Sequence, residues 1–181
     1  MSKSVRRNKA AAVAEDWWRA LTADQSAGRG ARRGALARLR RAVTPLEVMQ
    51  EPEALRLIAR LPRNPERVAT LAGILAYVRE TEGRTVARSI GRASLDDEKA
   101  ILSEVRFRRL LQARNDELEL LEAMRRIVRL TSGKVNVYDL SYAVLHWGDR
   151  VRKRWIFDYY GVSESTPSGD HPALSPAHDT T

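Results

Sequence analysis

Apolar residues recur at intervals of three and four residues along almost the whole of this 181-residue chain. The longest such stripe consists of Leu140, Val144, Trp147, Val151, Trp155 and Tyr159. This spacing is typical of a helix that buries one face. No segment alternates apolar and polar residues for long enough to form a sheet, because residues 134–137 are too few. The chain is therefore predicted to be all-α, with one long helix from Asn136 to about Tyr160.

Start signals place several other helices. Thr44 followed by Pro45, and Asn64 followed by Pro65, each combine an N-cap residue with proline at the first helical position. Glu47 stands where it can complete a capping box with Thr44. Further N-caps are expected at Ser103, Asn115 and Asn136.

Turn signals and composition divide the chain into five parts. These are a basic flexible arm (1–9), an N-terminal helical subdomain (10–93), a linker (94–102), a C-terminal helical subdomain (103–160) and a tail (161–181). The tail holds hardly any large apolar residue, so burial cannot offset its ordering entropy and it is predicted to be disordered. We expect two packed, bundle-like helical subdomains followed by this tail.

Several classes of protein are excluded by what the sequence lacks. Without cysteine it can form no disulfide, zinc ribbon or iron–sulfur cluster. Its apolar runs fall far short of the roughly 20 residues of a membrane span, and its N-terminal region has no secretory pattern. We therefore expect a soluble, cytoplasmic protein.

Catalytic residues are hard to find in this chain. His171 and His178 fall in the tail, and His146 beside Trp147 is best interpreted as structural. The consecutive run at residues 96–99 is typical of a solvated linker rather than of a metal nuclease site. No phosphate-binding glycine loop, nucleophile elbow or paired histidine ligands are present. We expect no enzyme activity, no cofactor and no metal.

The charge balance instead favours a polyanionic partner. The chain carries 32 Lys and Arg against 23 Asp and Glu, a formal charge of +9. Only five of the basic residues are lysine, and arginine offers a planar fork that matches two phosphate oxygens. Codon bias in a GC-rich genome would also raise the arginine content, so the positions of the arginines matter more than their number.

Those positions are helical. Arg106 and Arg109 are three residues apart, and Arg125 and Arg129 are four apart with Arg126 beside them. Any single arginine can be explained as a solvated one, for example Arg126 paired with the acid four residues before it. The whole set predicts a surface that follows a phosphate backbone without reading sequence. The aromatic side chains on the apolar stripe are expected in the core.

An ordered series of short motifs adds a more specific signal. The series runs Asp16-Trp17-Trp18-Arg19-Ala20-Leu21, Leu39-Arg40-Arg41-Ala42, Leu61-Pro62-Arg63-Asn64-Pro65, Ser89-Ile90-Gly91-Arg92-Ala93, Ser103-Glu104-Val105-Arg106-Phe107-Arg108-Arg109-Leu110-Leu111, Val135-Asn136-Val137-Tyr138-Asp139-Leu140 and His146-Trp147-Gly148-Asp149-Arg150. In order and spacing it resembles the CasB family, the small subunit of the type I-E CRISPR surveillance complex Cascade. The resemblance covers about residues 10–160.

The resemblance implies an all-helical, non-catalytic subunit present as a pair in a ribonucleoprotein. Its implied partners are the other Cascade subunits, a second copy of itself, the guide RNA, and the target and displaced DNA strands, with no membrane. Its implied role is to hold the displaced strand of the R-loop open for a separate helicase-nuclease during antiviral defence.

The resemblance also implies which residues contact the strand. By motif these are Arg41, Arg67, Arg106, Arg126 and Arg150; helical spacing adds Arg40, Arg109 and Arg129. Two alternatives stay open. A free-standing helical DNA- or RNA-binding regulator would need a recognition helix after a tight turn, and an enzyme acting on nucleic acid would need an essential carboxylate or histidine cluster.

Overall fold

The computed structural model describes residues 3–23, 29–97, 99–113 and 116–162. Its helices are α1 (Lys3–Thr22), α2 (Arg29–Arg41), α3 (Pro45–Met49), α4 (Pro52–Arg60), α5 (Pro65–Leu75), α6 (Val86–Ile90), α7 (Glu104–Gln112), α8 (Glu117–Leu130), α9 (Val137–Leu145) and α10 (Asp149–Tyr160). Within this described part, the strands are two residues long: β1 (Glu80–Thr81) pairs in parallel with β2 (Lys134–Val135). The all-α prediction is confirmed.

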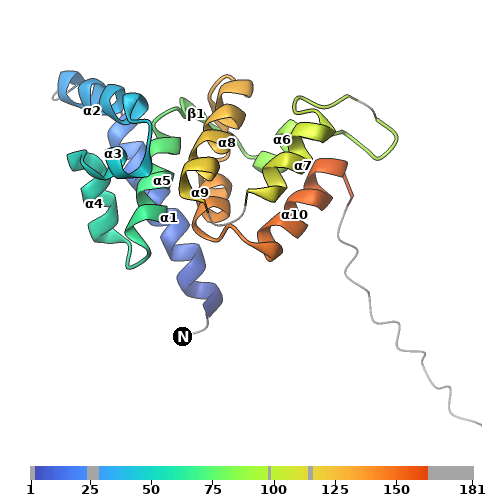
Figure 1. The fold of residues 1–181 in the computed structure, drawn as a ribbon, viewed down its shortest axis with the longest axis horizontal. Coiled ribbons are helices and arrows are strands. Elements are labelled where there is room, and N and C mark those ends of the chain that lie inside the picture. The colour runs from blue at the N-terminus through green and yellow to red at the C-terminus, as the bar shows by residue number, and fades with distance from the viewer. Residues whose placement is uncertain (1–2, 24–28, 98, 114–115, 163–181) are drawn as a thin grey trace, which may run out of the picture.

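The packing of the helices does not follow their order along the chain. Helices α2 to α5 lie at one end of the molecule, α6, α7 and α10 at the other, and α8 and α9 between them (Figure 1). Helix α1 packs on α9, α5 on both α8 and α9, and α6 on α10. One continuous apolar core therefore contains residues from both predicted subdomains.

Three of the predicted parts of the chain can be compared with the structure. Residues 91–97 and 99–103 connect α6 to α7 without a helix, where a linker is expected. Helix α1 begins at Lys3, inside the predicted basic arm. Of the predicted disordered tail (161–181), residues 163–181 lie outside the described residues.

Three of the predicted N-caps carry the expected hydrogen bond. Thr44 accepts from the amide of Glu47 (3.2 Å), Asn64 from that of Glu66 (2.9 Å), and Asn136 from that of Asp139 (2.8 Å). These side chains each satisfy an amide that the first turn leaves unpaired.

Other start signals differ in detail from the prediction. The Glu47 carboxylate accepts from the amide of Val43 (2.7 Å), one residue before Thr44. Ser103 is the N-cap residue of α7 but makes no side-chain capping bond. Helix α8 is capped by Asp116, which accepts from the amide of Glu119 (3.0 Å), while Asn115 lies outside the described residues.

The prediction of one helix from Asn136 to Tyr160 is wrong. Helix α9 ends at Leu145 and α10 begins at Asp149, although all six residues of the predicted stripe are buried. At the break, the indole Nε1 of Trp147 donates to the carbonyl of Ala113 (2.7 Å), while its ring meets Trp155 edge-on at 5.2 Å. The break thus buries the Trp147 ring and still satisfies its polar nitrogen, which a buried tryptophan requires.

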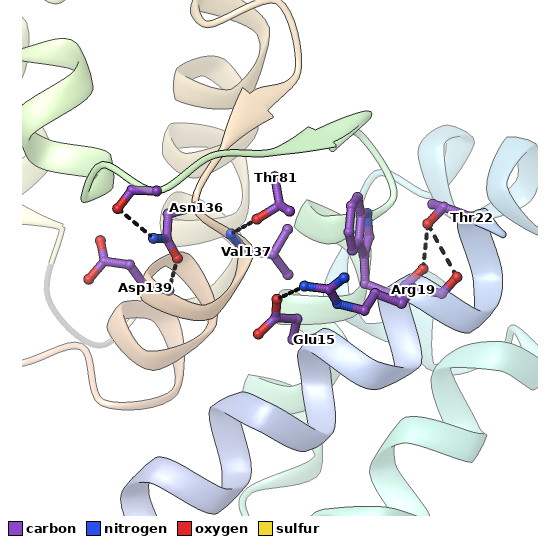
Figure 2. A network of polar contacts seen from close by, with 9 residues as sticks. Glu15, Arg19, Thr22, Thr81, Asn136, Val137 and Asp139 are labelled. Atoms are coloured by element: carbon purple, nitrogen blue, oxygen red, sulfur yellow. Dashed lines mark hydrogen bonds and ion pairs between the residues drawn. The ribbon is translucent and has the colours of Figure 1, made fainter.

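The N-terminal end of α9 is held by the segment around β1. The hydroxyl of Thr81 accepts from the amide of Val137 (3.2 Å), and the Asn136 side chain donates to the carbonyl of Gly83 (3.3 Å). Figure 2 shows these contacts beside α1, which carries the pair Glu15–Arg19. The short strand pair therefore fixes α9 between α1 and the chain that leads to α6.

Candidate nucleic-acid interface

Three of the predicted arginines come together in one groove. Arg106 and Arg109 from α7 and Arg126 from α8 line an open groove of about 630 Å³. Its remaining walls are Leu102, Leu110, Ala113, Glu119, Glu122, Ala123 and Ile127. We call this the α7–α8 groove. All three arginines are exposed.

The apolar pattern of each helix turns these arginines outward. On α7, Phe107 and Leu110 are buried, and Phe107 stacks on Tyr159 with ring centroids 3.9 Å apart. Arg106 and Arg109 each precede one of these buried residues and lie on the exposed side of the helix. On α8, Met124 and Val128 are fully buried. Arg126 lies between them in sequence and therefore on the opposite face of the helix.

The groove can bind an anionic chain by charge and hydrogen bonding. Within the described residues, none of its three guanidinium groups makes a hydrogen bond or an ion pair, including the one that sequence suggested between Glu122 and Arg126. Glu119 and Glu122 lower the positive potential of the groove but leave it net positive. No aromatic ring lines it among the described residues. The arrangement therefore suits phosphate oxygens better than stacked bases.

Two other predicted arginines surround Tyr77. The guanidinium of Arg129 lies 4.8 Å from the centre of the Tyr77 ring, and the Tyr77 hydroxyl donates to the carbonyl of Arg40 (2.8 Å). Arg40 in turn donates through Nε to the carbonyl of Ala76 (2.7 Å). Both arginines are exposed and partly engaged in holding α2, α5 and α8 together.

Arg41 and Arg150 lie apart from the α7–α8 groove. Arg41 is exposed at the end of α2, and Arg150 lines a separate hollow of 440 Å³ between α9 and α10. In that hollow Arg154 pairs with Asp139 (2.7 Å). Burial raises the pKa of the Asp139 carboxyl, an effect that the charge of Arg154 opposes.

Arg67 is placed differently from the other seven. Its side chain is only 14% exposed and lies 2.6 Å from the carboxylate of Glu117. It also donates to the carbonyl of Val144 (3.0 Å). This guanidinium thus joins α5 to α8 and α9 inside the fold.

Arg125 has a role that the sequence did not reveal. It is 6% exposed and donates to the carbonyls of Gly73 (3.1 Å), Ala42 (2.7 Å) and Leu39 (3.0 Å). Burial lowers the pKa of its guanidinium, which is nevertheless charged at neutral pH. Its sequence position, four residues before Arg129, gives no sign that it faces inward.

Neither a metal-binding cluster nor a membrane-spanning helix occurs among the described residues. Across residues 3–23, 29–97, 99–113 and 116–162, no group of three or more His, Cys, Asp or Glu side chains could hold a metal ion. In the same ranges no helix has the length and apolar character to cross a membrane. His146 follows α9, with its ring 4.8 Å from that of Tyr142.

Comparison with known proteins gives the family. The sequence profile of the CRISPR-associated protein Cse2 matches residues 35–160. The chain belongs to the Cse2 family. CasB is the name of Cse2 as the type I-E small subunit, so the resemblance found in the sequence motifs is confirmed.

Solved structures agree with this Cse2 fold. A chain in the crystal structure of E. coli Cascade bound to a PAM-containing double-stranded DNA target superposes with a TM-score of 0.60 and 19% identity, over 81% of this chain and 93% of that one. The Cse2 family protein of Thermus thermophilus gives a TM-score of 0.60 with 25% identity, over 90% and 100% of the two chains. No curated protein sequence matches.

Proposed function

We propose that this Cse2 family protein is the non-catalytic small subunit of a type I-E Cascade complex. In this role it binds nucleic-acid backbone without reading sequence and stabilises the displaced DNA strand of the R-loop. The family match supports the assignment, as does the similar chain in the DNA-bound E. coli complex. The observation that carries the binding proposal is the convergence of Arg106, Arg109 and Arg126 on the α7–α8 groove.

The energetics of R-loop formation suit a surface of this kind. The RNA–DNA hybrid is about as stable as the DNA duplex that it replaces, so modest contacts to the freed strand can shift the balance. Each phosphate that an arginine neutralises also releases counterions, whatever the base attached to it. A groove with arginine forks and no aromatic platform provides such contacts.

The remaining predicted residues fit this role to different degrees. Arg41 and Arg150 are exposed and are proposed as further backbone contacts outside the groove. Arg67 would have to leave Glu117 and Val144 before it could bind a strand, so we place it in the fold rather than on the surface. The partners we propose are the other Cascade subunits, a second copy of this chain, the guide RNA, and the target and displaced strands.

The proposal is tested by removing the groove's charge from the whole protein. The variant R106Q/R109Q/R126Q is compared with R56Q/K99Q/R108Q, which loses the same charge at exposed positions outside the groove. Single-stranded DNA affinity is measured by fluorescence anisotropy over a range of salt concentrations. The groove variant should lower the log–log salt slope by about 2, at about 0.7 per phosphate contact on a single strand, while the control keeps the wild-type slope.

Assembly provides the second readout. Tagged protein purified from its host should carry larger Cascade subunits and short repeat-containing RNAs, and complexes with the groove variant should form R-loops of shorter lifetime. Equal slopes for the two variants would contradict the groove as the binding surface. Recovery of the protein alone, or with chromosomal DNA from discrete sites, would instead support the regulator.

A further inference from the structure

A second basic groove lies where α1, α2 and the chain before β1 meet. It has a volume of 390 Å³ and is lined by Leu21, Thr22, Ala23, Arg32, Arg33, Leu36, Arg40, Val78 and Arg79. We call this the α1–α2 groove. Unlike the α7–α8 groove, it has no carboxylate among its described lining residues. Of these lining residues only Arg40 belongs to the surface predicted from sequence.

Local structure directs the arginines of this groove to one side. Arg33, Leu36 and Arg40 are spaced three and four residues apart on α2 and so share one face of the helix. Arg79 approaches from the opposite wall, where its amide donates to the carbonyl of Gly133 (2.8 Å). Gly133 has φ +83°, and a Cβ there would lie 2.9 Å from the Arg79 Cγ. Glycine at this turn therefore leaves room for the Arg79 side chain.

The guanidinium groups of two residues in this groove are available for a ligand. Arg33 and Arg79 are exposed, and neither guanidinium makes a hydrogen bond or an ion pair with a residue that the structure describes. Arg40 uses its Nε for the carbonyl of Ala76 (2.7 Å), which fixes the direction in which its fork points. The guanidinium groups of Arg33 and Arg79, beside that of Arg40, are a suitable set of hydrogen-bond donors for phosphate oxygens.

Helical spacing and two contacts connect the two grooves. Arg126 lines the α7–α8 groove, and Arg129 follows it three residues later on α8. Arg129 lies over the ring of Tyr77, and the Tyr77 hydroxyl donates to the carbonyl of Arg40, which lines the α1–α2 groove. Exposed arginines thus continue from one groove to the other across Tyr77.

We propose that the α1–α2 groove is a second backbone-phosphate site, and that a single strand seated in the α7–α8 groove continues across Tyr77 into it. Arg33 and Arg79 are the residues that bind the phosphates there. This inference rests on the proposed function, since it extends the same strand. It makes binding depend on strand length, because only a long strand can occupy both grooves.

The experiment compares full-length R33Q/R79Q with K99Q/R108Q, which loses the same charge on and near α7. The probes are labelled oligothymidylates of increasing length, with oligouridylates as the RNA counterpart. For the longest strands, R33Q/R79Q should weaken binding about 20-fold near 0.1 M salt and lower the salt slope by about 1.4, as expected for two lost phosphate contacts. For the shortest strands its affinity should equal that of the wild type, and the control should match the wild type at every length.

The outcomes separate this inference from the function on which it rests. If R106Q/R109Q/R126Q weakens binding at all lengths but R33Q/R79Q at none, the α1–α2 groove is not a site and the proposed function stands. If R33Q/R79Q weakens short and long strands equally, the continuous path is wrong. If the wild type binds neither probe, the proposed function itself fails. A length-dependent loss with only one probe supports the inference and assigns the groove to DNA or to RNA.

Discussion

Arg125 provides a test of how two helix ends are stabilised in the core. The carbonyls of Leu39 and Ala42 lie at the C-terminal end of α2, where no further helical amide reaches them. Near the end of α5, the Tyr77 amide donates to Ile74, leaving the carbonyl of Gly73 for Arg125. One buried guanidinium therefore caps both helices, with its charge at the negative ends of their dipoles.

The substitution Arg125→Met keeps an unbranched, flexible side chain, although a shorter one, and removes every donor. Three hydrogen bonds from a charged donor contribute about 1.5–3 kcal/mol each. Met avoids the several kcal/mol that desolvating a guanidinium costs, which offsets part of this loss. We expect the free energy of unfolding to fall by about 3–5 kcal/mol, because three buried carbonyls lose their donor at about 1–3 kcal/mol each.

The assay is urea unfolding of the full chain, followed by circular dichroism and tryptophan fluorescence. Arg126→Met is the matched control, because the adjacent side chain is exposed and its loss should change stability by less than about 0.5 kcal/mol. A lower midpoint with an unchanged denaturant slope would identify a loss of stability alone. If both variants had free energies of unfolding within about 1 kcal/mol of the wild type, which is close to the error of the extrapolation, the capping role of Arg125 would be refuted. Water would then be able to satisfy the three carbonyls.

Two further predictions concern the region around α9 and α10. Trp147→Phe removes the indole donor to Ala113 and should lower the free energy of unfolding by about 1–2 kcal/mol; an unchanged urea midpoint would contradict this. Asp139→Asn tests a linkage to pH. Because burial raises the pKa of Asp139 in the folded state, its contribution to stability is fully present below its unfolded pKa, about 4, and is lost as pH rises through the folded pKa. As pH rises above about 4, the pKa of an unfolded Asp, the free energy of unfolding of the wild type should therefore fall relative to that of the Asn variant. A pH-independent difference would show that the carboxyl titrates alike in both states.

Local signals in the sequence were sufficient where the cause is local. Thr44, Asn64 and Asn136 cap helices because a short polar side chain can reach an amide two or three residues ahead. The spacing of the apolar stripe likewise identified buried residues such as Trp155. It did not reveal the break near Gly148, because α9 and α10 continue the same apolar spacing on either side of the bend.

The sequence alone could not show which arginines line the candidate site. Arg125 and Arg126 are adjacent and identical in type, yet one is buried against three carbonyls and the other lines the α7–α8 groove. The difference comes from where α2 and α5 end, which is a property of the tertiary structure. Arg67 was predicted as a strand contact, but its low exposure depends on Glu117, which is 50 residues away. Arg33 and Arg79 line one groove because the chain before β1 returns to α2.

The interleaved packing has a consequence for how the protein is made. Helix α1 covers its apolar face with α9, and α5 with α8 and α9, so the partners of the first helices are encoded in the last third of the chain. Contacts so distant in sequence form late, because the intervening loop must close first. The N-terminal helices leave the ribosome with those faces uncovered, and the faces can be covered only after α9, which ends at Leu145, has been synthesised.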